Sequence, residues 1–360
     1  MKILNIYILK QFLATLFFAL IALCVIFLVV NLLENLDSFL DQNATFEIIV
    51  KYYIYFFPEI LKLLTPIATL MATLFSIGKL STANEITAMK SGGMSLYGII
   101  KPLVIVSLMI SFVHLFFNGW IVPEANQIKL SIEKKYLNRD VGGTPIFNLQ
   151  FRDNPQRNVL MQYYDSYVMS GNRVTIEDYS SEVTPRLVKR IEASKILWDT
   201  VNSRWKLVTG NERDYTGNQV QVKTFDTMNV VLKMQHKQIM QLQRSPDEMN
   251  FDDFKNYIDL LKQGGKDVSK QLIEYHGNYA FPFANLIVIL FGVPFASIRK
   301  KGGIAIQIGA AMVISFFYLV FTKISQTIGY TYNVNPIIAA WSANIIFLTL
   351  ALVNLYKTRT

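Results

Sequence analysis

Long apolar stretches separated by short polar segments make up both ends of this 360-residue chain. Six of them reach the roughly 20 mostly apolar residues that a helix needs to cross a bilayer. The first has a longer apolar core than a signal peptide, and no cleavage site with small residues follows it, so we expect an uncleaved span. The predicted spans are Phe12–Leu33, Tyr52–Gly78, Leu96–Val122, Asn278–Ile298, Gly302–Thr322 and Pro336–Tyr356.

The stretch between the third and fourth spans has a β pattern. Short alternating or β-rich runs are separated by turn signals such as Asp153-Asn154-Pro155 and Ser170-Gly171-Asn172, at a spacing typical of a sandwich or jelly roll. Aromatic and aliphatic residues at helical spacing from Asn250 to Lys262 then predict an amphipathic helix. We therefore predict a membrane α-helical protein with an inserted all-β, jellyroll-like domain. The expected parts are spans one to three in residues 1–123, the β domain in 124–249, a connecting amphipathic segment in 250–277, and spans four to six in 278–360.

Charge sets the expected orientation. The net charge is +9, yet residues 124–274 hold 22 Lys/Arg and 20 Asp/Glu, which leaves 13 basic and 6 acidic residues for the apolar ends. The basic residues gather before the first span, after the last, and in alternate gaps, so the positive-inside rule places these segments and both termini in the cytoplasm. The insert then lies outside the cytoplasm, and the main argument for nucleic-acid binding disappears.

The sequence offers no catalytic constellation. The pattern G-x-x-x-x-G-K-S/T is absent, so we do not expect the chain to hydrolyse ATP. His114, His236 and His276 lack metal-ligand spacing, and the single cysteine, Cys24, excludes a disulfide framework. For His114, inside a span, we expect a carbonyl or water as its partner. We predict no catalytic residue, no metal site and no cofactor bound by this chain.

Three of the charged residues in or beside the spans are candidates for contact with a substrate. Glu59 and Lys62 are one helical turn apart in the second span. They form either a water-lined surface for an anionic or amphiphilic substrate or an interfacial pair that neutralises itself. Lys323, at the outer end of the fifth span, either contacts an anion or extends to the interface. Both alternatives remain open at this point.

The segment Gly78–Gly93 predicts a short cytoplasmic helix between the second and third spans. Ser81 or Thr82 can cap its first turn, and Glu85 has the spacing to close a capping box with Thr82. Gly92-Gly93 is expected to end it.

One side of this short helix is apolar, because Ile86 and Met89 lie three residues apart. We expect this side to be exposed to a cytosolic partner. The alternative, a helix lying on lipid, would bind weakly because so little apolar area is available.

Several short motifs occur together over the length of the chain, namely Gly78–Gly93, Phe281-Pro282, Gly292–Ala296, Arg299–Gly303, Asn335-Pro336 and Ala340-Trp341. In combination they resemble the LptF/LptG permeases of lipopolysaccharide export. The segment Asn35–Phe39 is closer to LptG, towards which we lean, and Gly78–Gly93 is closer to LptF.

The resemblance implies a multi-pass subunit of the bacterial inner membrane with a periplasmic β-jellyroll. Such a subunit pairs with a second LptF/LptG-type permease on a dimer of the ATPase LptB and associates with LptC. The complex extracts lipopolysaccharide and passes it to a periplasmic bridge that includes LptA. ATP and Mg would bind at the partner ATPase, and this chain would be non-catalytic.

The resemblance also implies roles for particular residues. The helix after the second span would be the coupling helix, and the first and fifth spans would form lateral gates. The chain departs from the family at three places. Ala83 stands where a basic residue is frequent, and lysines are frequent both at the place of Glu34 and Asp37 and at the place of Glu59. The expected coupling residues are Glu85, Ile86, Met89, Gly92 and Gly93, and the expected substrate contacts are Lys51, Lys62, Lys323, Phe27, Phe317 and Tyr318.

An ion-coupled secondary transporter of an amphiphilic substrate is the alternative function. It would require acidic or histidine relays within the membrane, and only Glu59 and His114 approach that description. Copurification with a nucleotide-hydrolysing subunit separates the two functions.

Overall fold

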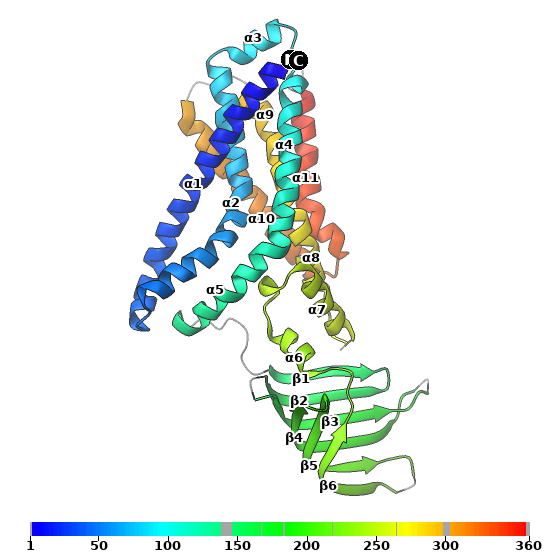
Figure 1. Ribbon diagram of the computed structural model, residues 1–360. Helices are drawn as coiled ribbons and strands as arrows, with labels where there is room; N and C mark the ends of the chain where they lie inside the picture. Colours follow the sequence, from blue (N-terminus) through cyan, green and yellow to red (C-terminus); the bar gives the residue numbers. More distant parts are fainter. Residues whose placement is uncertain are drawn as a thin grey trace. The chain divides into compact units, whose positions relative to one another are not determined.

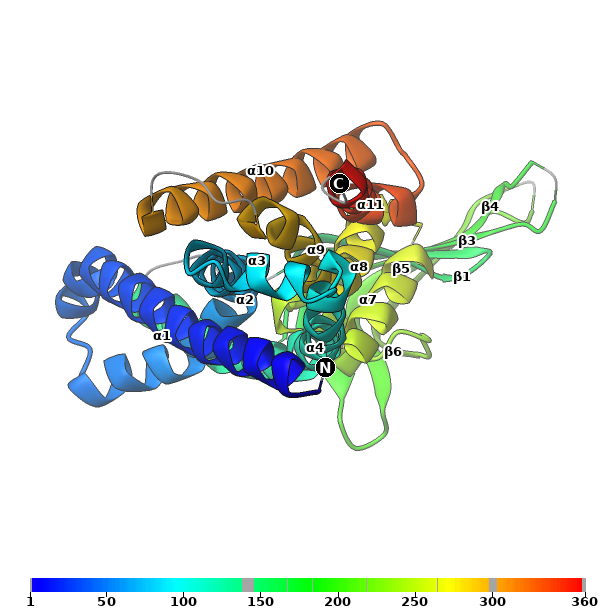
Figure 2. The same ribbon diagram turned by 90° about the horizontal axis from the view of Figure 1, so that it is seen from above.

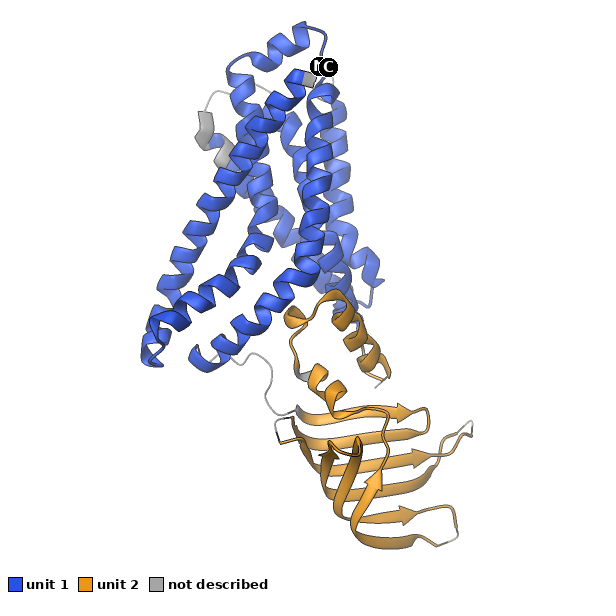
Figure 3. Cartoon of the chain, in the orientation of Figure 1, with its two compact units in different colours: residues 1–139, 269–360 blue, residues 140–268 orange. Residues whose placement is uncertain are grey.

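The computed structural model describes residues 2–137, 146–297 and 303–357, apart from residues 167, 183, 218 and 264. The chain forms two compact units, one from residues 1–139 and 269–360 and the other from residues 140–268 (Figure 3). The first unit is helical, and the second carries a β-sheet (Figure 1). The basic loop at 299–301 lies outside the described residues.

Six helical segments of the described residues are long and apolar enough to cross a membrane, which confirms the predicted number of spans. A π-helical turn joins α4 to α5, and a 3-10 turn joins α8 to α9. The helices of this unit are α1 (Lys2–Asp41), α2 (Phe46–Thr82), α3 (Glu85–Ser91), α4 (Leu96–Phe116), α5 (Val122–Tyr136), α8 (Ser269–Ala280), α9 (Ala284–Ser297), α10 (Gly303–Thr331) and α11 (Pro336–Lys357).

Several helices extend beyond the apolar pattern. The 40 residues of α1 span about 60 Å, roughly twice the apolar thickness of a bilayer. We expected the third span to end at Val122 and the insert to begin at residue 124, but the helix continues through α5, and the first strand begins at Ile146. The reason is that α5 buries charged residues against α2, including Lys129 and Glu133, so hydropathy falls while the helix goes on.

Helix α2 lies at the centre of the helical unit, where it packs against α1, α5, α9 and α10. Figure 2 shows α1 and α10 on opposite sides of α2. The apolar segments of α1 and α10 are the least buried of the six spans. The main helical core is defined by buried apolar residues, most of them on α1, α2, α3, α4 and α9 and single ones on α10 and α11; among them are Ile8, Phe12, Leu80, Ile86, Ile99 and Val293.

The second unit is a six-stranded antiparallel sheet in which each strand pairs with the next along the chain. An inserted β domain is therefore confirmed, and its described strands form a meander. The amphipathic helix predicted near residues 250–262 is also confirmed as α7. The elements are β1 (Ile146–Asn154), β2 (Arg157–Asp165), β3 (Ser170–Tyr179), β4 (Leu187–Asp199), β5 (Arg204–Asp214), β6 (Gln221–Val230), α6 (His236–Gln243), a 3-10 turn (Pro246–Glu248) and α7 (Phe251–Gln263).

One predicted turn is wrong, because Ser170-Gly171-Asn172 is the start of β3. Gly171 is needed there for packing: a Cβ at this position would lie 2.8 Å from Cγ2 of Ile196 on β4. The segment that follows β6 in the chain covers the apolar face of the sheet. Ile239 of α6 and Leu260 of α7 pack on it, and the Trp205 indole donates a hydrogen bond to the Met234 carbonyl at 2.9 Å.

The close approach of β4, β5 and β6 at Gly210 makes a testable prediction. A Cβ at Gly210 would meet Phe225 Cζ at 2.6 Å and the Ala193 Cα at 3.0 Å, so Gly210→Ala forces these strands apart. We expect Gly210→Ala to destabilise the sheet by about 1–3 kcal/mol, the cost of overpacking, seen as a lower Tm of the purified protein. Gly217→Ala is the matched control, because a Cβ there has no neighbour closer than 3.7 Å. An equal Tm for both variants would contradict the prediction.

Candidate functional site

The short helix α3 is present, but its start differs from the prediction. Helix α2 continues to Thr82, and only Ala83 and Asn84 separate it from α3; Asn84 has a left-handed φ of 60° and no side-chain cap. The predicted capping box is wrong, because the hydroxyls of Ser81 and Thr82 donate to the carbonyls of Ser297 and Gly78 instead. Both residues belong to the last turn of α2, from which the Thr82 hydroxyl reaches back to a carbonyl of the same helix and the Ser81 hydroxyl reaches the last residue of α9.

The end of α3 is confirmed at Gly92-Gly93. Gly93 has a φ of 86°, a conformation that favours glycine, and the Met94 N–H bonds the Met89 carbonyl at 2.9 Å. Both glycines are exposed, and Glu85 at the other end of α3 is half-buried.

The apolar side of α3 faces the helices rather than the outside. Ile86 is 2% exposed and Met89 9% exposed, and both belong to the main helical core. The expectation that these two side chains are exposed to a partner is therefore wrong. A seven-residue helix is unstable alone, so its one apolar side is used to attach it to the unit. The exposed face is made by Thr87, Ala88 and Lys90.

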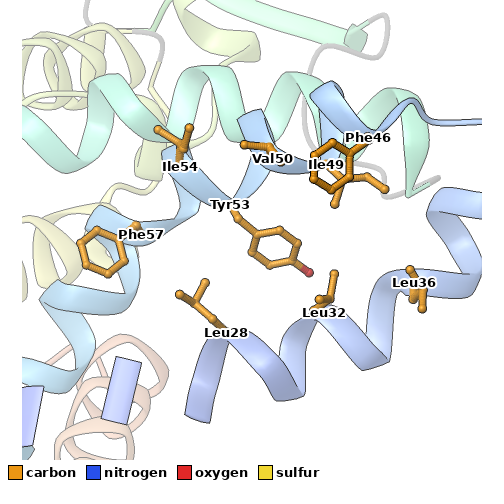
Figure 4. Close-up of a pocket in the computed structure, with 9 residues that line it drawn as sticks. All are labelled: Leu28, Leu32, Leu36, Phe46, Ile49, Val50, Tyr53, Ile54 and Phe57. Atoms are coloured by element: carbon orange, nitrogen blue, oxygen red, sulfur yellow. The ribbon is translucent and has the colours of Figure 1, made fainter. Parts of the chain in front are cut away.

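A second feature is an apolar groove of about 610 Å³ between α1 and α2, near the hairpin that joins them. In Figure 4 the side chains of Leu28 and Leu32 on α1 face Tyr53 on α2 across it. Phe27 lies beside the groove, with its ring centroid 6.2 Å from that of Phe56. The groove is lined by Leu28, Leu32, Leu36, Phe46, Ile49, Val50, Tyr53, Ile54 and Phe57.

The expected substrate contacts on α10 differ in accessibility. Phe317 is 60% exposed and Lys323 is also exposed. Tyr318 is 3% exposed, and its hydroxyl donates to Oδ1 of Asn344 on α11 at 2.6 Å. Its expected contact with substrate is not supported by this burial, because the hydrogen bond turns the ring towards α11. On α2, Lys51 is exposed and Lys62 is half-buried.

A buried charge network joins α2 to α5, and sequence reasoning missed it. The Lys129 ammonium pairs with Glu59, lies 3.9 Å from Glu133 and sits 5.2 Å from the centroid of the Phe56 ring. The Tyr52 hydroxyl donates to Glu133 at 2.8 Å. Glu59 is thus paired across helices. The signal in the sequence was the i,i+4 spacing of Lys129 and Glu133, next to apolar Ile128 and Ile132.

Two of the three histidines have side-chain hydrogen-bond partners. His114 is buried, and its Nδ1 lies 3.0 Å from Nδ2 of Asn285, whose Oδ1 accepts a hydrogen bond from the Thr69 hydroxyl. A side-chain amide is thus the partner of this ring nitrogen, where the sequence predicted a carbonyl or water. In the β unit, Nδ1 of His236 lies 2.6 Å from the Tyr164 hydroxyl, and burial lowers the pKa of His236. Within the part of the chain that the structure describes, no group of three His, Cys, Asp or Glu residues could hold a metal.

These features define a polytopic membrane protein with an inserted β domain and a short helix fixed to its bundle. Residues 6–357 match the family of the lipopolysaccharide export system permease LptF/LptG, and the chain belongs to that family.

Individual relatives are similar at low identity. The LptF permease protein of the lipopolysaccharide export system of Escherichia coli K12 is 20% identical over 377 residues, which cover 98% of this chain and 94% of that protein. LptF of Shigella flexneri matches to the same extent. LptG of Escherichia coli K12 is 18% identical over 286 residues, which cover 79% of this chain and 78% of that protein. The chain is thus similar to both LptF and LptG.

Proposed function

We propose that this chain is the permease subunit of an ATP-driven transporter that extracts lipopolysaccharide from the bacterial inner membrane. In this proposal it pairs with a second LptF/LptG-type permease and binds an LptB dimer, which holds ATP and Mg. It also associates with LptC and passes lipopolysaccharide through its periplasmic β domain to LptA. Both termini and α3 lie in the cytoplasm, as the distribution of basic residues predicts.

The observation that carries the proposal is the attachment of α3. Its apolar side is buried in the main helical core, and its polar side is exposed, so a partner bound to Thr87, Ala88 and Lys90 would move the helices that hold Ile86 and Met89. A tightly packed attachment transmits displacement rather than absorbing it. ATP binding to the partner would then favour one arrangement of the helices over another.

The apolar groove supports the substrate part of the proposal. A lipid with several acyl chains leaves a bilayer only where other apolar surface replaces the lost burial, about 0.8 kcal/mol per CH₂. The groove between α1 and α2 offers such a surface, and so does the exposed apolar side of α10 with Phe316 and Phe317.

An ion-coupled mechanism has less support. Its two candidate residues are engaged with other parts of the protein, Glu59 with Lys129 and His114 with Asn285.

Photo-crosslinking in cells tests the proposal with adjacent residues of opposite exposure. We expect a photoreactive residue at Ala88 to capture the ATPase, and one at buried Met89 to capture much less. One at Phe317 is expected to capture lipopolysaccharide in an ATP-dependent manner, and one at Tyr318 much less. No ATPase adduct at Ala88 in a well-expressed protein would contradict the proposal and favour the ion-coupled transporter.

A further inference from the structure

The first turns of α1 and the short helix α3 share one core although they are far apart in the sequence. Ile8 and Phe12 of α1 are fully buried, and they belong to the main helical core together with Ile86 and Met89. Figure 1 shows the beginning of α1 and α3 at the same end of the helical unit.

A polar contact lies beside this shared core. The Tyr7 hydroxyl donates a hydrogen bond to Oε1 of Glu85, at 3.4 Å, between residues 78 positions apart in the chain. Glu85 occupies the first turn of α3, where the helix dipole stabilises a carboxylate. Hydrogen bonds to a charged acceptor are worth more than those between neutral groups. The contact therefore fixes the start of α3 to α1 on the exposed edge of the core.

The rest of α1 is held less firmly. Its apolar segment is among the least buried of the spans, and it packs mainly on α2 with a smaller contact to α4. Leu28, at the apolar groove, lies 21 residues beyond Tyr7, or about 32 Å along a helix. Since no proline occurs within α1, we expect it to move as a continuous rod over this length.

We propose that Tyr7 is a positioning residue that ties α1 to α3, so that a displacement of α3 is carried along α1 to the groove. The proposal rests on the proposed function in one respect, that the ATPase moves α3. The link itself is a property of this chain, and it can be measured without the ATPase.

The only cysteine reports on the link. Cys24 is buried on α1, where it packs against Ile60 and Leu64 of α2. Tyr7→Phe removes the hydroxyl and keeps the ring, so we expect a maleimide to label Cys24 about fivefold faster in the purified full-length chain, the effect of one lost hydrogen bond. Tyr356→Phe, on an exposed tyrosine near the end of α11, is the control and is expected to label at the wild-type rate. Equal rates for Tyr7→Phe and wild type would overturn the proposal.

Coupling is measured next, in proteoliposomes that contain the complete complex. We expect Tyr7→Phe to lower the lipopolysaccharide released per ATP hydrolysed by about fivefold, while copurification of the ATPase stays at the wild-type level. Because Tyr7 acts through Glu85, Tyr7→Phe should add nothing to the effect of Glu85→Gln. Additive losses would contradict the link. Faster Cys24 labelling together with no ATPase adduct at Ala88 would support the link and reject the proposed function.

Discussion

Lys129→Met is expected to loosen the α2–α5 contact by about 2–3 kcal/mol, less than for a fully buried pair, because it leaves the buried Glu133 and the half-buried Glu59 without their cation. The Lys129 side chain is 7% exposed, and it neutralises Glu59 while lying beside Glu133. Methionine keeps most of the length and apolar surface of the lysine stem, so the loss of stability at the α2–α5 contact comes mainly from the missing charge. The same contact is packed by a cluster from α1, α2 and α5 made of Phe39, Tyr52, Ile132 and Leu137.

Labelling of Cys24 measures this effect as well, since Cys24 packs with Ile60 of α2, the residue after Glu59. We expect labelling in Lys129→Met to be at least about tenfold faster and the Tm to be lower. Removing the stranded charges in Lys129→Met/Glu59→Gln/Glu133→Gln should restore most of the loss. Lys270→Met breaks an exposed i,i+4 pair with Glu274 and should cost at most about 0.5 kcal/mol. If both lysine variants behave alike, the network does not hold the contact.

The sequence predicts the number of spans well and their ends poorly. Apolar windows of about 20 residues identify membrane-crossing helices reliably, because no other surroundings accept so much apolar surface. The ends depend on partners that hydropathy does not contain. Lys129 and Glu133 look like the start of a soluble segment, but they are buried because Glu59 and Tyr52 on α2 satisfy them.

The candidate site shows the same limit. The spacing correctly predicts that Ile86 and Met89 share one side of a helix. Spacing does not say whether the bundle of the same chain or a partner protein covers that side. Tyr318 and Phe317 are adjacent aromatic residues on one span, and only the position of Asn344 on α11 decides that Tyr318 turns inwards. Ser81 and Thr82 are good capping residues, yet α2 continues through them.

The helical unit has one helix-to-helix contact near each of its two ends. At one end α3, α1 and α2 share the main helical core, and near the α1–α2 hairpin the Lys129 network holds α2 to α5. Helix α2 takes part in both, and it contains Pro58 next to Glu59 of the network and Pro66 between the network and the main helical core. Proline removes a helical hydrogen bond, so these positions are where α2 bends most easily. Under the proposed function, α1 carries displacement directly, while α2 adjusts at its prolines.

Ile86→Asp is expected to reduce lipopolysaccharide export at least about tenfold, because it puts a carboxylate into the apolar attachment of α3. Ile86 is almost fully buried in the main helical core, so α3 must detach or the charge must stay desolvated. Thr87→Asp puts the same charge on the exposed face proposed to bind the ATPase, so it leaves the attachment of α3 intact and tests that contact instead. Tyr356→Asp, on the exposed tyrosine near the end of α11, is the control and is expected to keep wild-type export. Export per amount of folded protein is measured in proteoliposomes of the complete complex.

Ile86→Ala, which leaves a cavity but no charge, keeps the test valid if Ile86→Asp fails to fold. Its export should lie between that of wild type and that of Ile86→Asp. Full export by Ile86→Ala together with a loss in Thr87→Asp would mean that the exposed face alone matters and that α3 does not transmit through its buried side.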